Sequence, residues 1–402
     1  MGPGFSPLDE ALGLSGDGGG YSPHLLSWLV RLGAEVPFAR AAFWLEELTG
    51  LGVSAATVRR HTEAVGATAV ALVDAEVARL ERDLPEAPEQ PERLVLGADG
   101  AMVPLVGGEW AEVKLLSVGK PLPVGTAGNG TPIRTQQVSY FARLADAETF
   151  GRQALGELHR RGLERAATVA AVQDGALWLQ GFVDLHRPDA VRILDWPHAA
   201  EHLTVLAEQL FGVQTARAQR VAERLRRWLW EQGPQRVLAV LAGWQRARPE
   251  LTAAVAYFRE RRAQLDYPCF RAAGWPVGSG ATESGHKQVM QARLKRAGMH
   301  WARPQVNPLL ALTLLEHNDR WASDGPALFA QHRQQQRRQR QRTRHQTRSQ
   351  TRCRAWDQPW VIPASPAPVP LTPPLPAVVP QPRPAAASHP WRRYGARLSA
   401  KM

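Results

Sequence analysis

The spacing of apolar residues changes twice along the chain, and each change predicts a domain boundary. From residue 21 to about residue 80, apolar side chains recur at the spacing of a helix. Residues 81–93 include LPEAPEQPER, whose prolines and glutamates predict a linker. After the linker, short apolar runs predict strands with helices between them. Residues 1–20 are rich in glycine and are expected to form a flexible N-terminus.

The helical region at 21–80 holds two helices separated by a short turn. PFARAAFWLEELTG is amphipathic, LGV follows it, and Ser54 is placed to cap a second helix, SAATVRRHTEAVG. This arrangement predicts a helix-turn-helix that binds DNA with its second helix. The side chains that would then face DNA are those of Thr57, Arg59, Arg60 and His61. The alternative is an ordinary helical hairpin that packs against the rest of the protein.

Residues 94–199 alternate between strand and helix patterns. LVL, VKLLSV and QVSYFARL predict three strands, and AETFGRQALGELHRRG predicts a helix after them. ATVAAVQ is a fourth strand, GALWLQGFVDLH a short helix, and AVRIL a fifth strand that ends at Asp195. The order β-β-β-α-β-α-β predicts the first part of an α/β domain with a mixed sheet.

The strand pattern stops at residue 200. Over 200–272, apolar residues such as Leu203, Leu206 and Leu210 recur at helical spacing, and glycines and prolines mark helix ends and starts. We therefore expect an all-helical insertion, after which residues 273–325 complete the α/β core with its final helices. Residues 326–402 are rich in Arg and Gln and then in Pro, and they are predicted to be a disordered tail.

The net charge of +12 is unevenly placed along the 402 residues. From Gln331 to the C-terminus there are thirteen Arg, one Lys and one Asp, so this segment carries +13 and the preceding 330 residues sum to −1. Such a tail predicts a polyanionic partner. No apolar stretch approaches the ~20 residues that span a bilayer, and residues 1–21 lack a signal-peptide pattern. Two distant cysteines, Cys269 and Cys353, fit a reducing cytosol, so we expect a cytoplasmic protein without a membrane partner.

Three acidic residues stand where such a fold exposes a carboxylate. Asp99 follows the first strand in LVLGADG, and Asp174 ends the fourth in ATVAAVQDGA. Glu283 lies in VGSGATESGHKQVMQARLKRAGMHW, where a glycine-rich stretch leads into a helix. Two strand-end aspartates and one helical glutamate can converge on a pair of divalent cations, which polarise a phosphodiester and activate the attacking oxygen. Ligation by carboxylates suits Mg²⁺ or Mn²⁺ rather than zinc.

This order of elements and acids resembles the ribonuclease-H-like fold of DDE transposases. DWPH at 195–198 is similar to the (C/D)xxH motif that follows the second aspartate in Mutator-like transposases and their bacterial insertion-sequence relatives. Four segments look like the transposase blocks of one such bacterial group: DGAMVPLVGGEWAEVKLL, VQDGALWLQGF, DWPHAAEHL and GSGATESGHKQVMQARLKRAGMHW. The resemblance covers about residues 21–325.

The resemblance implies a metal-binding catalytic triad of Asp99, Asp174 and Glu283 that holds two Mg²⁺ or Mn²⁺ ions. Asp195 and His198 would form an accessory motif beside it, although a core or helix-capping role for His198 stays open. Asp195 is also the alternative to Asp174 as second ligand, and Asp174 is preferred because it ends the fourth strand.

Two cations follow Glu283 along the same predicted element. Arg293 and Lys295 are expected to contact the DNA backbone. Surface ion pairing is the equally open alternative for both side chains.

The activity implied is DNA transposition on double-stranded DNA, both the terminal repeats of the element and the target. Water would first free a 3′-hydroxyl at an element end, and that hydroxyl would then attack target DNA in the same site. The protein is expected to act as a homo-oligomer on DNA associated with the nucleoid. Two other interpretations stay open: a transposase-derived DNA-binding protein without catalysis, and a ribonuclease-H-like nuclease. A glycosidase with paired carboxylates would not explain the basic tail.

Overall fold

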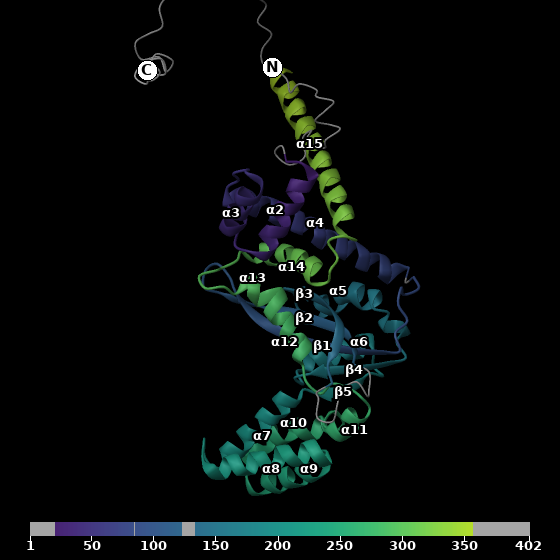
Figure 1. The fold of residues 1–402 in the computed structure, drawn as a ribbon, viewed down its shortest axis with the longest axis vertical. Helices are drawn as coiled ribbons and strands as arrows, with labels where there is room; N and C mark the ends of the chain where they lie inside the picture. The colour runs from purple at the N-terminus through teal and green to yellow at the C-terminus, as the bar shows by residue number, and fades with distance from the viewer. Residues whose placement is uncertain (1–20, 84, 123–132, 357–402) are drawn as a thin grey trace, which may run out of the picture. The chain divides into compact units, whose positions relative to one another are not determined.

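The structure of the chain is a computed structural model that describes residues 21–83, 85–122 and 133–356 (Figure 1). The predicted flexible N-terminus, residues 1–20, lies outside these ranges, and so does the C-terminal part of the predicted tail, residues 357–402. None of the helices in the described ranges is both long enough and apolar enough to cross a membrane.

Three helices form the N-terminal region, and two of them are the helices predicted around the turn. They are α2 (Pro23–Glu35), α3 (Phe38–Thr49) and α4 (Ala55–Arg82). Gly50 ends α3 in the left-handed conformation, and the Ser54 side chain caps α4 by accepting a hydrogen bond from the Thr57 amide at 3.1 Å. Helix α4 continues into Glu81 and Arg82, the first residues of the predicted linker, because glutamate and arginine favour a helix.

A five-stranded mixed sheet forms the centre of the protein, as predicted. Its strands are β1 (Arg93–Pro104), β2 (Trp110–Pro121), β3 (Thr135–Arg143), β4 (Thr168–Gln173) and β5 (Val191–Leu194). The spatial order is β3-β2-β1-β4-β5. The pairs β1–β2 and β2–β3 are antiparallel, whereas β1–β4 and β4–β5 are parallel. With the connecting helices α5 (Ala147–Arg160) and α6 (Leu177–His186), this topology is compatible with a ribonuclease-H-like fold.

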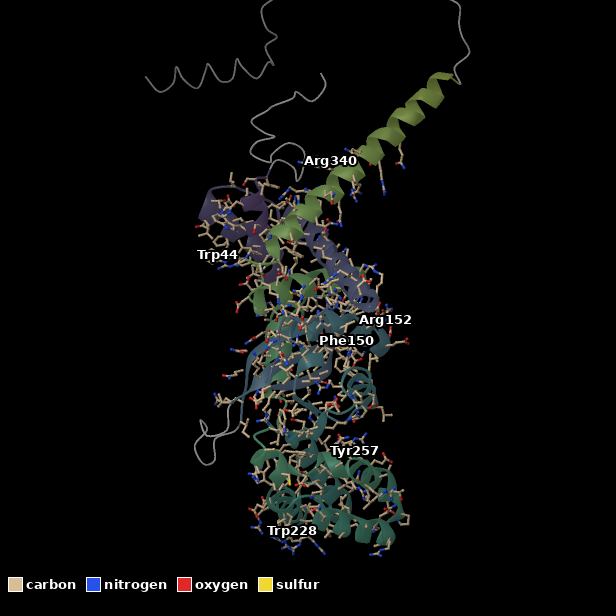
Figure 2. The ribbon with its side chains drawn as sticks, turned by 90° about the vertical axis from the view of Figure 1, so that its right-hand side faces the viewer. Trp44, Phe150, Arg152, Trp228, Tyr257 and Arg340 are labelled. Atoms are coloured by element: carbon tan, nitrogen blue, oxygen red, sulfur yellow. The ribbon has the colours of Figure 1, made fainter. Side chains whose placement is uncertain are left out.

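The two faces of the sheet pack against different sets of helices. Leu94 and Leu96 on β1 share a core with Phe150 of α5, which Figure 2 labels beside the sheet. Val95 points to the other face and packs with the helices that follow β5. Gly97 continues this second face, and a Cβ atom there would lie only 2.2 Å from Oγ1 of Thr282. The helix that carries Thr282 therefore lies directly against β1.

The insertion after β5 is helical throughout, as predicted. Its main helices are α7 (Trp196–Phe211), α8 (Ala216–Gln232), α9 (Pro234–Ala247), α10 (Thr252–Glu260) and α11 (Tyr267–Ala272). Figure 1 shows these helices gathered beyond the β5 edge of the sheet, and Tyr257 and Trp228 lie among them in Figure 2. Buried residues of β4 and β5, such as Val172 and Ile193, join the core of this helical group.

After the insertion the chain returns to the sheet. Helix α12 (Gly280–Gly285), π-helix η4 (His286–Gln291) and α13 (Ala292–Leu294) follow one another, and α14 (Arg303–His317) then packs against α4. Where the sequence predicted one continuous helix after the glycine-rich stretch, the structure has a π-helical segment within it. Segments of π-helix are rare and occur often at functional sites.

The predicted tail begins later than residue 326, because helix α15 spans Gly325–Trp356. Leu328 and Phe329 are buried in the N-terminal helical core, and buried His332 lies 3.0 Å from the hydroxyl of Thr68. These few apolar residues anchor the first turns, and the arginines and glutamines that follow are good helix formers.

Candidate active site

Asp99 lies inside β1 rather than after it, where the sequence had predicted it, because pairing with β2 extends the strand to Pro104. It is on the face of β1 that α12 covers. Its side chain is 42% exposed, and Oδ2 lies 3.2 Å from Nε2 of His286. The two atoms are close enough for an ion pair, but the contact is not a hydrogen bond, because Nε2 of His286 forms none. Oδ1 of Asp99 accepts a hydrogen bond from the Gly100 amide at 2.7 Å. Buried His286, which the sequence did not single out, is therefore the nearest titratable partner of the first predicted ligand.

Asp174 occupies a turn at the carboxyl end of β4 that the insertion holds in place. Its Oδ1 accepts a hydrogen bond from the Ala176 amide at 2.8 Å, and Gly175 has a φ of +89°. The Tyr257 hydroxyl donates to the Asp174 carbonyl at 2.8 Å, and Arg261 donates to the Gly175 carbonyl at 2.7 Å. Burial raises the pKa of Tyr257 to about 12, so the hydroxyl keeps its proton and donates at neutral pH.

Asp195 is fully buried, and each of its carboxylate oxygens has a partner. Oδ2 lies 2.7 Å from Nδ1 of His198, and Oδ1 accepts a hydrogen bond from the Ser279 amide at 2.7 Å. Asp195 also caps the N-terminus of α7. The Ser279 hydroxyl in turn donates to Oε1 of Glu283 at 3.2 Å. Asp195 therefore joins the start of α7 to the residue that precedes α12, and through it to Glu283.

Glu283 is exposed on α12, whose other side is packed tightly on the sheet. Thr282 is buried and hydrogen-bonds to the Ser117 hydroxyl at 2.8 Å. Gly285 lies so close to Tyr140 that a Cβ atom would come within 2.6 Å of its ring. This packing fixes the helix and turns Glu283 towards solvent.

The electrostatics of His198 connect these residues. Burial by itself would lower the pKa of the imidazole, but the hydrogen bond that it donates to Asp195 and the charges of Asp195, Asp174 and Asp99 raise the pKa above its ordinary value. The charge of the imidazole is thus coupled to three carboxylates: Asp99 within β1, Asp174 after β4 and Asp195 after β5. Because its folded pKa is raised, the stabilisation from charged His198 is complete below the unfolded pKa near 6.5 and is lost as pH rises through the folded value.

We predict that the pKa of His198 in the metal-free protein, measured by NMR titration, lies above the ordinary histidine value. Asp195→Asn should lower this pKa, because the substitution removes the carboxylate that accepts the imidazole hydrogen bond and whose negative charge favours the protonated ring. Addition of Mg²⁺ should also lower it in the unsubstituted protein, because a cation among the carboxylates offsets their charge. If the pKa of His198 is the same with and without Mg²⁺, that result would argue against metal binding at Asp99 and Asp174.

Within the described residues, no group of three or more His, Cys, Asp and Glu side chains is arranged to hold a metal ion. The donor chemistry nevertheless suits a hard cation, because Asp99 and Glu283 present exposed carboxylate oxygens. Metal binding by Asp99, Asp174 and Glu283 would require their side chains to draw together, and it stays a prediction.

The expectation that Arg293 contacts DNA is wrong, because its side chain is 1% exposed. The guanidinium donates to the Gly33 carbonyl at 3.0 Å and lies 4.7 and 4.8 Å from the rings of Phe38 and Trp301. Burial lowers its pKa to about 10, which leaves it charged at neutral pH. Arg293 thus ties the end of the α12–α13 segment to the N-terminal helices. Lys295 is exposed, as the prediction for it requires.

Of the α4 residues predicted to face DNA, some are exposed and one is buried. Arg59 and Arg60 are exposed and line a pocket of about 580 Å³ with Thr57 and Gln305. His61 is buried and packs edge-on against Tyr21 at 5.5 Å, so the expectation that it faces DNA is wrong.

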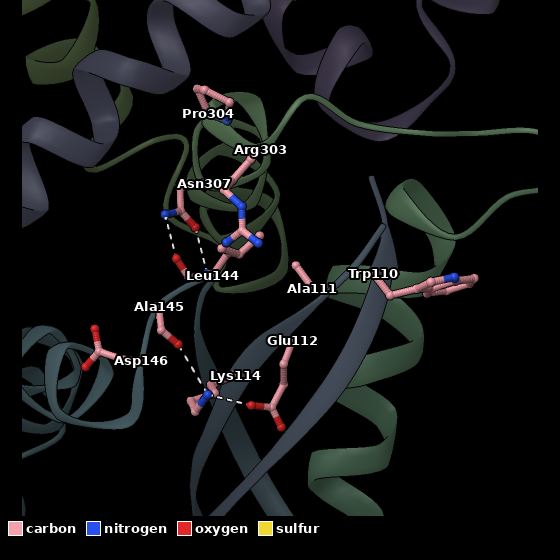
Figure 3. Close-up of a pocket in the computed structure, with 10 residues that line it drawn as sticks. All are labelled: Trp110, Ala111, Glu112, Lys114, Leu144, Ala145, Asp146, Arg303, Pro304 and Asn307. Atoms are coloured by element: carbon pink, nitrogen blue, oxygen red, sulfur yellow. Dashed lines mark hydrogen bonds and ion pairs between the residues drawn. The ribbon is translucent and has the colours of Figure 1, made fainter. Parts of the chain in front are cut away.

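A second pocket, of about 630 Å³, lies at the start of β2 (Figure 3). Lys114 stands opposite Gly100 in the register of β1 and β2, so its side chain is on the face away from Asp99. Its amine already donates to Glu112 at 2.6 Å and to the Ala145 carbonyl at 3.2 Å. This pocket is therefore separate from the acidic site.

No protein-family model matches this chain, and no curated protein sequence is significantly similar to it.

Proposed function

We propose that the protein is a DNA transposase of the DDE type that uses Asp99, Asp174 and Glu283 as its acidic triad. The observation that carries this proposal is the register of the parallel pair β1–β4. Gly97 pairs with Val172, so two residues further along each chain bring Asp99 and Asp174 to the same level of the sheet. Helix α12, with Glu283, covers the face of β1 to which Asp99 belongs.

The roles of the residues follow from their contacts. Mg²⁺ or Mn²⁺, when bound, would act as Lewis acid towards the scissile phosphodiester and lower the pKa of the attacking hydroxyl or water. Asp99, Asp174 and Glu283 would supply the carboxylate ligands. Asp195 positions Glu283 through Ser279, and this structural use of both its oxygens favours Asp174 over Asp195 as second ligand.

Recognition of DNA is proposed for the N-terminal helices and the basic residues after α14. Arg59 and Arg60 project from the second helix of a helix-turn-helix arrangement, where side chains reach the edges of bases in the major groove. The net positive charge from residue 331 onwards would attract duplex DNA without regard to sequence. Assembly of more than one copy on the paired ends of an element belongs to the same proposal.

One observation favours a second candidate, a transposase-derived DNA-binding protein without catalysis. Among the described residues, the acidic side chains are not arranged to hold a metal ion. The same arrangement is expected of a protein that has lost catalysis. A nuclease without strand transfer is the third candidate.

A strand-transfer assay separates the three. The DNA that flanks the reading frame supplies the candidate terminal repeats, and a duplex with one such end is incubated with target plasmid and Mg²⁺. Joining of the 3′-hydroxyl to plasmid DNA supports the transposase. Cleavage without joining indicates the nuclease, and binding with neither reaction indicates the DNA-binding protein.

A further inference from the structure

The solvent-facing side of α8, within the insertion, carries a row of arginines. Its members are exposed and follow one another at spacings of three and four residues, which places them on one face of the helix. They are Arg217, Arg220, Arg224 and Arg227. The opposite face is buried and consists of Ala218, Ala222, Leu225 and Leu229. Because the apolar face is occupied by the core of the insertion, the arginine row is the side that α8 offers to a partner.

Within the part of the chain that the structure describes, none of these four arginines forms an ion pair. Arg217 lies 4.6 Å over the ring of Phe211. Glu223 and Glu231 are also exposed on α8, but neither reaches an arginine of the row. No carboxylate of the described residues therefore lies within ion-pair distance of the row, and its four guanidinium groups remain open to solvent.

Like charges within the row oppose the helix that carries it, and Glu223 and Glu231 offset this repulsion only in part. Arg217 stands in the first turn of α8, where the positive end of the helix dipole disfavours a cation. Arg220, Arg224 and Arg227 stand three and four residues apart, and like charges at these spacings repel by roughly 0.2–0.5 kcal/mol per pair. A negatively charged partner along the row would remove both penalties.

We propose that the arginine row of α8 binds the phosphate backbone of double-stranded DNA, and this rests on the transposase function proposed above. The row spans ten residues of helix, about 15 Å at 1.5 Å per residue. Along one strand of a duplex, successive phosphates are about 3.4 Å apart along the DNA axis, one per nucleotide. Several phosphates therefore lie within reach of a straight row of that length. Guanidinium groups also match phosphate oxygens geometrically.

The position of α8 agrees with this partner. It packs against α7 in the helical group that Figure 1 shows beyond β5. Asp195 caps the start of α7, and His198 in its first turn contacts Asp195. Helix α7 has 16 residues, so its far end lies about 24 Å from that turn, the length of about seven base pairs. A duplex that ends in the acidic site and runs along α7 would thus meet α8 within one turn of DNA.

The test is the salt dependence of DNA binding by the full-length chain with Arg220→Gln, Arg224→Gln and Arg227→Gln together. Binding to a random 40-base-pair duplex is followed by fluorescence anisotropy between 50 and 200 mM salt. Each lost phosphate contact lowers the slope of log K against log salt by about 0.9, so the slope should fall by about 2.7. The affinity gained on going from 200 to 50 mM salt should then shrink by about 40-fold.

The matched control removes the same charge from the same insertion away from α8: Arg246→Gln, Arg248→Gln and Arg259→Gln. Circular dichroism confirms that both variants keep the helical content of the parent. An unchanged slope in the α8 variant, or an equal fall in the control, overturns the proposal. An equal loss of affinity for single-stranded RNA also overturns it, because the row would then bind any polyanion.

The strand-transfer assay keeps the two proposals apart. A fall in slope confined to the α8 variant supports the duplex-binding surface even where the parent protein joins no DNA ends. If the parent protein transfers strands and the slope of the α8 variant is unchanged, the duplex-binding surface is overturned and the transposase function is supported.

Discussion

Asp99→Asn, Asp174→Asn and Glu283→Gln are each expected to abolish Mg²⁺-dependent strand cleavage while DNA binding stays nearly intact. Each substitution keeps the shape of the side chain and removes the charge that a divalent cation requires. Changing a residue that only hydrogen-bonds to a metal ligand lowers activity by roughly 10–100-fold. The cleavage rate should fall by more than this here, because each substitution removes a ligand itself. Affinity for duplex DNA should stay equal or rise slightly, since one negative charge is removed near a polyanion.

The measurement is the rate of strand cleavage at an element end, with Kd for the same duplex measured in parallel. Glu47→Gln serves as the control, since its carboxylate is exposed on α3, which packs against α2 and α4. Full cleavage by any one of the three variants would exclude that residue from the triad. Loss of DNA binding together with cleavage would indicate damage to the fold and leave the triad unsupported.

Asp195→Ala is expected to destabilise the protein and to slow cleavage, whereas Asp195→Asn should be milder. Alanine removes the cap of α7, worth about 0.5–2 kcal/mol. It also leaves the half-buried Ser279 amide without its acceptor, at a further cost of up to about 1–3 kcal/mol. Asparagine still offers Oδ1 to Ser279 and can donate to the neutral imidazole of His198. The Glu283 side chain, held through Ser279, should be less well placed in the alanine variant.

Urea denaturation gives the stability change, and calorimetric titration with Mn²⁺ separates a positioning role from ligation. If Asp195 positions the site, Asp195→Asn keeps the metal stoichiometry and weakens cleavage by roughly 10–100-fold. The matched Asp174→Asn variant should instead lose bound metal. The reverse pattern, with metal lost from Asp195→Asn and kept in Asp174→Asn, would make Asp195 the second ligand.

The periodicity of the sequence predicted the elements well, because that signal is local. The three antiparallel strands, the parallel pair after α5 and the helical insertion follow from runs of apolar residues at spacings of two or of three to four. The position of Asp174 after β4 follows from the same runs, whereas Asp99 lies inside β1 because pairing with β2 extends that strand beyond its apolar run. The register of β1 and β4 brings the two residues to the same level of the sheet.

The tertiary structure decided which charged and polar side chains face solvent. Arg293 is buried because the Gly33 carbonyl and the rings of Phe38 and Trp301, distant in sequence, supply its partners. His61 is buried by Tyr21 in the same way. Local spacing places a side chain on a face of its helix, but only the packing of distant segments determines what covers that face.

The sequence by itself determined the elements, the order of the acids along them and the arginine spacing on α8. Only the tertiary structure decided that Asp195 is enclosed by His198 and Ser279, that His286 lies beside Asp99, and that Tyr257 holds the Asp174 turn. The physical reason is that hydrogen bonds and burial depend on distances between segments far apart in the chain. Those distances are set by the packing of α10 and α12 against the sheet and leave no periodic signal in either helix.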